Sequence, residues 1–510
     1  RRRLAFDELF LIQAFGQQQK ILWQSENAPL VSFDQKLIKS FVASLPFTLT
    51  DGQRKAAWEI LQDLAKPRPM NRLLEGDVGS GKTIVALIAA LQCANAGWQI
   101  AFMAPTEILA QQHFKEVALR LKNYPLKIAL LTNSTSSLAE EGQTASVAKK
   151  QILTAIKTGQ IKIVIGTHAL IQKSVCFKNL ALAVVDEQHR FGVQQRAALQ
   201  KNTLDLCDGL PHSVPHLLSM TATPIPRTLA LAIYGDLDLS LLKELPRGRQ
   251  KIITKIIPPD ERKTDYEFIR QEIKKGRQAF VICPRIEIAN NHKLNTPGPN
   301  ENYLSEIHDP FASLNEVKAV KQEVEKLTIK IFPEFKITAL HGKLKPAEKN
   351  KTMADFKAGE INILVSTSVV EVGIDIQNAT VMMIEGAERF GLAQLHQFRG
   401  RVGRGEHQSF CLLLTDSSSA KTNQRLKALL TAKSGFELAE KDLALRGPGE
   451  FYGSNQWGLP DLSMASLSDV GLLKEVRQEA IKLFKTDPEL KNNPRLKERL
   501  RDFQVLIHPE

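Results

Sequence analysis

The amino-acid sequence predicts an α/β fold of two tandem parallel-sheet lobes, with a helix before the first lobe and a helical module after the second. Short apolar runs that end in polar or glycine-rich turns alternate with helical stretches such as 84–96 and 107–122, which is typical of buried parallel strands joined by helices. The pattern occurs twice, on either side of about residue 240. The candidate strands are residues 73–74, 99–103, 162–165, 182–185 and 217–220, then 279–282, 336–340, 363–365, 381–384 and 411–414.

The two ends of the chain differ from the lobes. Residues 1–22 place apolar side chains at a spacing that fits one amphipathic helix, and after about residue 416 the sequence becomes charged and helical. We therefore predict a linker helix and connector over 1–45, a first lobe over 46–240, a second lobe over 241–415 and a helical module over 416–510. Because the chain opens with Arg1 in a helical pattern, we expect a longer protein upstream. Residues 286–315 are polar and rich in Asn and Pro, and are predicted to be a surface insertion.

Composition narrows the class of protein. The 510 residues are 43% hydrophobic and 24% charged, which excludes a mainly disordered or collagen-like chain. The net charge of +13 favours a polyanionic partner. No apolar run approaches the roughly 18 residues of a membrane span, so no membrane association is expected. The five cysteines are far apart and form no CxxC pair, which argues against zinc ribbons and disulfide scaffolds and favours a reducing cytoplasm.

A phosphate-binding loop is predicted between the first strand and the next helix. Its eight residues match G-x-x-x-x-G-K-[ST] and are Gly76, Asp77, Val78, Gly79, Ser80, Gly81, Lys82 and Thr83. Glycines let backbone N–H groups face phosphates, and the helix N-terminus adds a partial positive charge. Lys82 is expected on the β- and γ-phosphates, and the Thr83 hydroxyl on Mg²⁺. The alternative is a flexible Gly/Ser loop with a solvated lysine.

A second half of the site is predicted where the strand at 182–185 ends in two carboxylates. Asp186 is expected to hold Mg²⁺ and Glu187 to polarise the attacking water. The alternative is a solvated acidic turn. Residues 397–405 carry three arginines separated by glycines. Such a sequence is more typical of a loop that binds an anion than of a buried core. Arg401 and Arg404 are the candidates for arginine fingers on the γ-phosphate, and the alternative is a basic loop that binds nucleic acid phosphate.

Further segments keep the order and spacing of superfamily 2 helicase motifs. Residues 104–107 (APTE), 166–168 (GTH), 221–223 (TAT), 340–342 (LHG), 365–375 and 397–404 resemble motifs Ia, Ib, III, IV/IVa, V and VI. Segment 186–193 (DEQHRFGV) resembles the RecG family of bacterial fork-remodelling helicases. Segment 220–230 resembles that family or its relative, the transcription-repair coupling factor, and 435–456 resembles the translocation motif that the two share. Residues 1–10 resemble the linker helix that follows the wedge domain of that family.

The resemblance implies two RecA-like lobes, ATP and Mg²⁺ as cofactors, and a C-terminal translocation module. It implies that ATP is contacted by Gln53 in a segment that resembles the adenine-reading motif, and by Gly373, Asp375 and Gln397. Short polar side chains in the motif loops are the candidates for DNA phosphate contacts, with N-caps or turns as the alternative. These residues are Thr106, Thr167, His168, Thr367 and Ser368, and the residues implied in translocation are Arg446 and Gln456.

The function implied by the resemblance is an ATP-dependent translocase and 3′→5′ helicase on double-stranded DNA. Its substrates would be stalled forks and Holliday junctions, with single-strand DNA-binding protein as a partner, in a monomeric motor of the bacterial nucleoid. One alternative is the motor half of a transcription-repair coupling factor, against which Gln188 and His189 argue. Another is an ATP-gated DNA-binding scaffold. The wedge domain that splits fork arms is not among these residues, so the sequence itself does not carry fork specificity.

Overall fold

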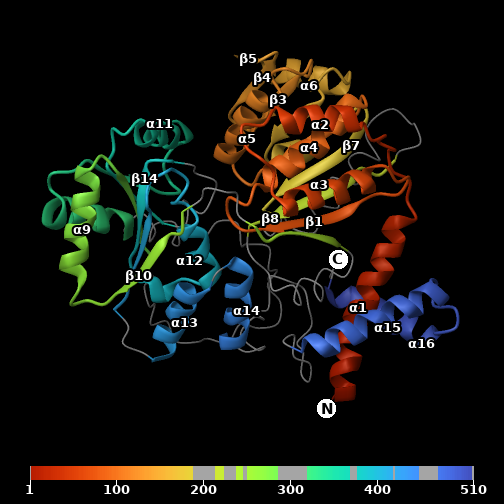
Figure 1. Cartoon of the computed structure of the whole chain (residues 1–510). Helices are drawn as coiled ribbons and strands as arrows, with labels where there is room; N and C mark the ends of the chain where they lie inside the picture. The colour runs from red at the N-terminus through yellow and green to blue at the C-terminus, as the bar shows by residue number, and fades with distance from the viewer. Residues whose placement is uncertain are drawn as a thin grey trace, which may run out of the picture. The chain divides into compact units, whose positions relative to one another are not determined.

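The computed structural model describes residues 2–187, 213–222, 237–244, 250–284, 319–367, 376–416, 420–432, 434–446 and 469–507 (Figure 1). The chain divides into two compact bodies, one formed by Arg1–Arg247 with Lys433–Glu510 and the other by Gly248–Ala432. We call these the first body and the second body, and each is described by itself. Among the described helices, none combines the length and the apolar character that crossing a membrane requires.

The first body is built on a nine-stranded sheet within the described residues. The strand order is β5-β4-β3-β6-β2-β7-β8-β1-β9, and all pairs are parallel except β3 with β4 and β4 with β5. Every side chain of β2 and β7 is buried, as expected for central strands covered on both faces. The strands are β1 (Asn71–Gly76), β2 (Gln99–Met103), β3 (Ile128–Leu131), β4 (Ser136–Glu140), β5 (Gln143–Ser146), β6 (Ile163–Gly166), β7 (Leu180–Asp186), β8 (His216–Thr221) and β9 (Asp238–Leu242).

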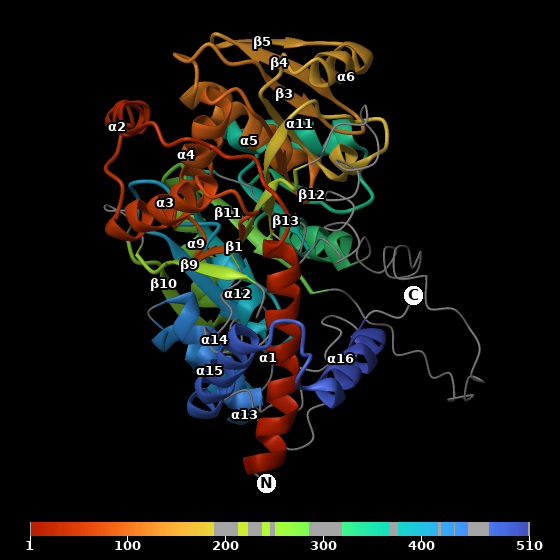
Figure 2. The same ribbon diagram turned by 90° about the vertical axis from the view of Figure 1, so that its right-hand side faces the viewer.

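Helices connect and cover these strands. Residues 84–94 of α4 are buried on every side, because the helix is apolar all round and lies under other elements of the body. The short β4–β5 hairpin lies beside α6 at one end of the body (Figures 1 and 2). The helices are α2 (Gln35–Ala43), α3 (Asp51–Leu64), α4 (Lys82–Asn95), α5 (Glu107–Arg120), α6 (Lys149–Lys157) and the 3₁₀ helix η1 (His168–Ile171).

The N-terminal and C-terminal helices pack together in the first body. Helix α1 (Arg2–Gln24) contacts α15 (Val470–Thr486) and α16 (Pro494–Ile507), as Figure 2 shows. Ala14 shares a buried cluster with Phe484 and other apolar side chains of the C-terminal helices. Phe15 adds an edge-on ring contact of 5.7 Å with Phe503. Each helix thus buries an apolar face that it could not bury alone.

The second body contains a six-stranded, all-parallel sheet in the order β10-β15-β14-β11-β13-β12 among the described residues. Its core includes Phe280 and Phe356, whose ring centroids lie 5.1 Å apart. The strands are β10 (Ile253–Ile257), β11 (Gln278–Ile282), β12 (Ile337–Leu340), β13 (Ile363–Ser366), β14 (Ala379–Ile384) and β15 (Phe410–Leu414). The helices are α9 (Arg262–Lys274), η3 (Leu327–Ile331), α11 (Pro346–Lys357), η5 (Ala387–Arg389), α12 (Leu392–Arg399) and α13 (Ala420–Thr431).

The predicted fold class is confirmed, and all ten candidate strands are present. Strands β3, β4, β5, β9 and β10 were not predicted. The four-part division of the chain stays a prediction, as does the surface insertion at 286–315, which lies outside the described residues. The C-terminal tail is helical as expected, with α14 (Gly435–Arg446), α15 and α16 belonging to the first body.

Candidate nucleotide site

The phosphate loop, residues 76–83, lies at the carboxyl end of a buried strand. Strand β1 ends at Gly76 and α4 begins at Lys82. Gly79 and Gly81 have φ of 77° and 82°, a left-handed conformation that glycine adopts without steric cost. A Cβ at Gly76 would lie 2.8 Å from Leu242 Cβ and 3.3 Å from the Leu242 carbonyl oxygen, so the packing of β9 against β1 favours glycine here. The loop therefore has the open backbone and the helix N-terminus that phosphate binding requires.

The Lys82 side chain is held over this loop. Its Nζ donates hydrogen bonds to the backbone carbonyl of Gly76 at 2.8 Å and to that of Asp77 at 3.1 Å. The residue is 8% exposed, which is low for a lysine. A phosphate is a stronger, charged acceptor than a carbonyl, so the amine is placed to transfer to an arriving triphosphate.

Asp186, the last residue of β7, is fixed by a histidine of α5. Asp186 Oδ2 lies 3.0 Å from Nε2 of His113, which is itself buried. Burial by itself raises the pKa of Asp186, but the hydrogen bond and charge of His113, the charge of Lys82 and the Glu187 N–H outweigh burial and lower the pKa. The carboxyl group is therefore held ionised, which is the state that a metal ligand requires.

Glu187 has a strained backbone. Its φ of 54° lies in the left-handed region, which is uncommon for a residue other than glycine. Its N–H donates to Asp186 Oδ1 at 3.1 Å. Strain of this kind is often stored at functional sites. The turn positions the two predicted carboxylates as one unit at the end of β7.

Gln53 lies against the phosphate loop, as the adenine prediction requires. Its Nε2 donates to the Ser80 carbonyl at 2.8 Å, and its Oε1 accepts from the Thr50 N–H at 2.9 Å. The second bond belongs to the capping box that starts α3. A Cβ at Gly81 would come within 2.2 Å of Gln53 Nε2. Contact with adenine itself stays a prediction.

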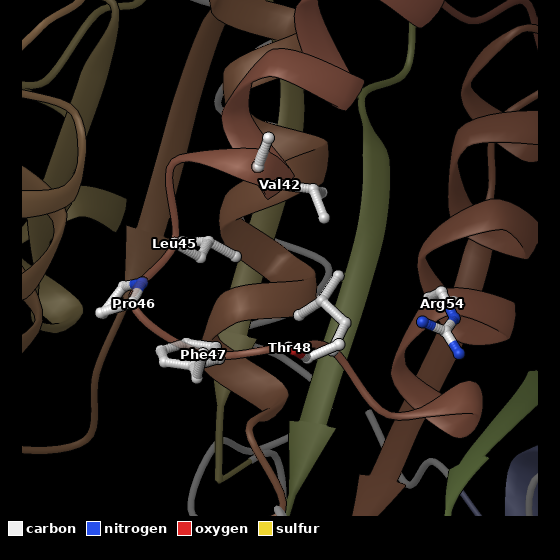
Figure 3. Close-up of a pocket in the computed structure, with 8 residues that line it drawn as sticks. Val42, Leu45, Pro46, Phe47, Thr48 and Arg54 are labelled. Atoms are coloured by element: carbon white, nitrogen blue, oxygen red, sulfur yellow. The ribbon is translucent and has the colours of Figure 1, made fainter.

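A pocket that the sequence analysis missed lies between α2 and α3. It has a volume of about 420 Å³, and Figure 3 shows its side chains on the segment between the two helices. Arg54, which adjoins Gln53, lines one side, and Phe47 lies on another. The Phe47 ring also receives the Arg120 guanidinium at 5.4 Å. The lining residues are Val42, Ala43, Leu45, Pro46, Phe47, Thr48, Leu49 and Arg54.

The DNA candidates of the first body have mixed environments. Thr106 is the N-cap of α5, and its hydroxyl accepts a hydrogen bond of 3.4 Å from the Leu109 N–H. This is the helix-capping role that the sequence analysis named as the alternative to DNA binding. Thr167 is 2% exposed, and its hydroxyl has no hydrogen-bond partner among the described residues. His168 is exposed, with Nε2 3.4 Å from Asn133 Nδ2. Their contact with DNA stays a prediction.

In the second body, Gln397 lies in the last turn of α12 and is buried. The helix continues to Arg399, the first of the three arginines in the predicted anion-binding segment. Leu395 and other apolar side chains of α12 are buried, and this burial stabilises the helix to its end. Arg401 is 5% exposed and Arg404 is half-buried. Thr367 is fully buried.

Several predicted residues lie outside what the structure describes. They are Gln188, His189, Ser368, Gly373, Asp375 and Gln456, together with the side chain of Arg446, whose backbone ends α14.

His113 and the pocket between α2 and α3 are the functional candidates that sequence reasoning did not find. His113 stands seven residues beyond Thr106, and no motif pattern marked it. Its role comes from a contact across 73 positions of the sequence. Such a contact carries no local signal. For the pocket, the aromatic Phe47 that begins the predicted adenine-reading segment, residues 47–53, was the available signal.

Family models match three stretches of the chain. A DEAD/DEAH box helicase model matches residues 50–232, a helicase conserved C-terminal domain matches 264–406, and the C-terminal part of domain 3 of ATP-dependent DNA helicase RecG matches 432–504.

Whole-chain comparisons agree with these models. The ATP-dependent DNA helicase RecG of Synechocystis is 47% identical over 98% of this chain and 56% of its own length. That of Staphylococcus aureus strain NCTC 8325 is 41% identical over 100% of this chain and 68% of its own. A solved structure of RecG bound to a three-way DNA junction aligns with a TM-score of 0.72 at 38% identity, over 94% of this chain and 56% of that one. The chain thus spans somewhat more than half the length of the curated relatives that it matches.

Proposed function

Because the chain belongs to the RecG family of ATP-dependent DNA helicases, we propose that it is an ATP-driven motor that moves along double-stranded DNA. The observation that carries the proposal is the phosphate loop at the carboxyl end of β1 and Asp186 at the carboxyl end of β7, in one parallel sheet, with the charge of Lys82 helping to lower the pKa of Asp186. This is the edge of an α/β sheet at which ligands bind. No other described part of the first body unites a glycine-rich loop with a strand-terminal carboxylate pair.

The phosphate loop fits a nucleoside triphosphate. Its glycines leave room for phosphates, and the buried Ser80 hydroxyl has no hydrogen-bond partner among the described residues. The residues that would hold Mg²⁺ are Thr83 and Asp186, and the bound ion supplies positive charge against the phosphates. Lys82 neutralises phosphate charge in the same way. Glu187 accepts a hydrogen bond from the attacking water and turns it toward the phosphorus.

The second body completes the site in this proposal. Arg401 and Arg404 supply charge to the γ-phosphate when the bodies close, which couples hydrolysis to their movement. Gln397, Gly373 and Asp375 contact the nucleotide from the same body. The support is the family membership and the position of Arg401 and Arg404 directly after α12.

The proposed substrates are stalled replication forks and Holliday junctions, unwound with 3′→5′ polarity and branch-migrated. Support comes from the relative solved on a three-way DNA junction. Short polar side chains of both bodies contact DNA phosphates and position the duplex without reading its sequence. These residues are Thr106, Thr167, His168, Thr367 and Ser368. Arg446 and Gln456 carry the movement to the DNA. The motor acts as a monomer in the bacterial cytoplasm near the nucleoid, with single-strand DNA-binding protein as a partner.

A triplex-displacement assay tests the motor. Wild-type protein with ATP should displace a third strand from duplex DNA, and Lys82→Ala should abolish displacement and reduce ATP turnover by about 10²-fold or more, because a charge on the phosphates is lost. Lys66→Ala, which changes a half-exposed lysine of the same body, is the matched control. Normal turnover in Lys82→Ala would refute the phosphate assignment. ATP-stimulated DNA binding without displacement by the wild type would favour the scaffold alternative.

A further inference from the structure

The phosphate loop is bonded directly to a helix of the C-terminal segment. Asp77 Oδ2 accepts a hydrogen bond of 3.0 Å from the backbone N–H of Gly435, the first residue of α14. The two residues are 358 positions apart and belong to the same body. The other carboxylate oxygen of Asp77 accepts from the Val78 N–H at 3.1 Å. One carboxylate therefore bridges the nucleotide loop and the start of α14.

The N-terminus of α14 favours a negatively charged partner such as the Asp77 carboxylate. The first turn of a helix has N–H groups without helical partners and a partial positive charge. The Ser434 hydroxyl accepts from the Glu437 N–H at 3.2 Å, so the serine caps one donor while Asp77 caps another. A carboxylate at this position forms a charge-assisted hydrogen bond, which is stronger than a bond between neutral groups.

We propose that the Asp77 carboxylate couples the occupancy of the phosphate loop to α14, so that nucleotide binding tightens the first turn of that helix. The inference rests on the proposed nucleotide site and adds a link from the phosphate loop to α14 within the first body. Asp77 acts here as a positioning residue, because its effect passes through α14 rather than through the reacting atoms.

The direction of the effect follows from charge. The arriving phosphates compete for loop amides such as the Val78 N–H, which is bonded to Asp77 Oδ1. They also place negative charge near the carboxylate. Both changes act on the carboxylate and make the Gly435 N–H and the positive end of α14 more favourable partners for Asp77.

Hydrogen exchange of wild-type protein tests the coupling directly. The exchange rates of peptides that cover residues 434–446 are compared without nucleotide and with saturating Mg²⁺ and AMPPNP. The occupancy of the site is measured separately, from the displacement of a fluorescent nucleotide analogue by AMPPNP. Exchange in the first turn of α14 should slow at least about threefold, a modest share of what a charged hydrogen bond contributes. Equal or faster exchange at full occupancy would overturn the coupling and leave the nucleotide site standing. Absence of nucleotide binding would contradict both proposals.

A matched pair of variants at the donor separates coupling from helix stability. Gly435→Pro removes the N–H, and proline is well tolerated at the first position of a helix, whereas Gly435→Ala keeps the N–H. The alanine variant should keep the nucleotide response at residues 436–438, and the proline variant should lose it. Strand displacement per ATP hydrolysed should be at least about threefold lower in the proline variant. Equal nucleotide responses in the two variants would contradict the proposal.

A second pair serves if the proline variant does not fold. Asp77→Ala removes the acceptor, and Ser434→Ala weakens the same helix start while it keeps the Asp77 bond. At nucleotide concentrations that saturate each variant, only Asp77→Ala should lose the exchange response of α14. Loss of the response in both, or in neither, would show that the link does not pass through Asp77.

Discussion

The hydrogen bond between His113 and Asp186 gives the sharpest prediction about the candidate metal site. We expect His113→Phe to weaken the Mg²⁺ dependence of nucleotide binding. The phenyl ring preserves the packing against Phe102, whose ring centroid lies 4.8 Å from that of the histidine, but it cannot donate to Asp186. The change therefore removes the 3.0 Å hydrogen bond and little else.

The magnitude follows from the burial of both partners, which are 6% and 9% exposed. A hydrogen bond to a charged group contributes about 1.5–3 kcal/mol. Loss of a residue that orients a metal ligand typically lowers metal affinity by about 10–100-fold. The two figures agree, since about 1.4 kcal/mol corresponds to a tenfold change.

The assay is a titration of Mg²⁺ at fixed fluorescent nucleotide, with ATP turnover measured in parallel. His113→Phe should raise the half-saturating Mg²⁺ concentration by about tenfold or more. His113→Gln keeps an amide donor and should recover part of the affinity. The reasoning is refuted if the phenylalanine variant titrates like the wild type, because Asp186 would then need no partner on α5.

Three further predictions concern stability and coupling. His216 is buried, its Nδ1 accepts from the Met70 N–H and its Nε2 lies 2.8 Å from a backbone carbonyl, so burial lowers its pKa. Below about pH 6.5 the His216 side chain binds a proton in the unfolded chain but stays neutral in the folded protein. The free energy of unfolding should therefore fall by up to about 1.4 kcal/mol for each pH unit below that value. Denaturant titrations of the wild type and of His216→Gln should diverge in this pH range. Arg72 donates to Asp63 from β1, and Arg72→Met should destabilise the first body by about 3 kcal/mol in denaturant unfolding, with Arg72→Lys affected less. Arg446→Ala should lower triplex displacement per ATP hydrolysed, and normal displacement would remove Arg446 from the translocation step.

The phosphate loop could be predicted because its requirements are local. Glycine at positions 79 and 81 and a lysine at the helix start are fixed by backbone conformation and charge within eight residues. The central strands could be predicted for a similar reason, since each is a short apolar run that must be buried on both faces. The pattern therefore appears in the sequence itself.

The missed elements depend on contacts between distant segments. Strands β4 and β5 are short and polar, and β5 is fully exposed, so no apolar run marks them. The packing of α1 on α15 and α16 joins the two ends of the chain, which amphipathic patterns alone do not pair. The link from Asp77 to Gly435 is of the same kind.

The central claim is that one nucleotide is held by residues of both bodies. Single-turnover ATP hydrolysis by Arg404→Ala tests it most directly, with exposed Arg389→Ala as the control from the same body. The account predicts a rate lower by about 10³-fold in Arg404→Ala, with nucleotide affinity close to that of the wild type. An unchanged rate at full nucleotide occupancy would contradict the account.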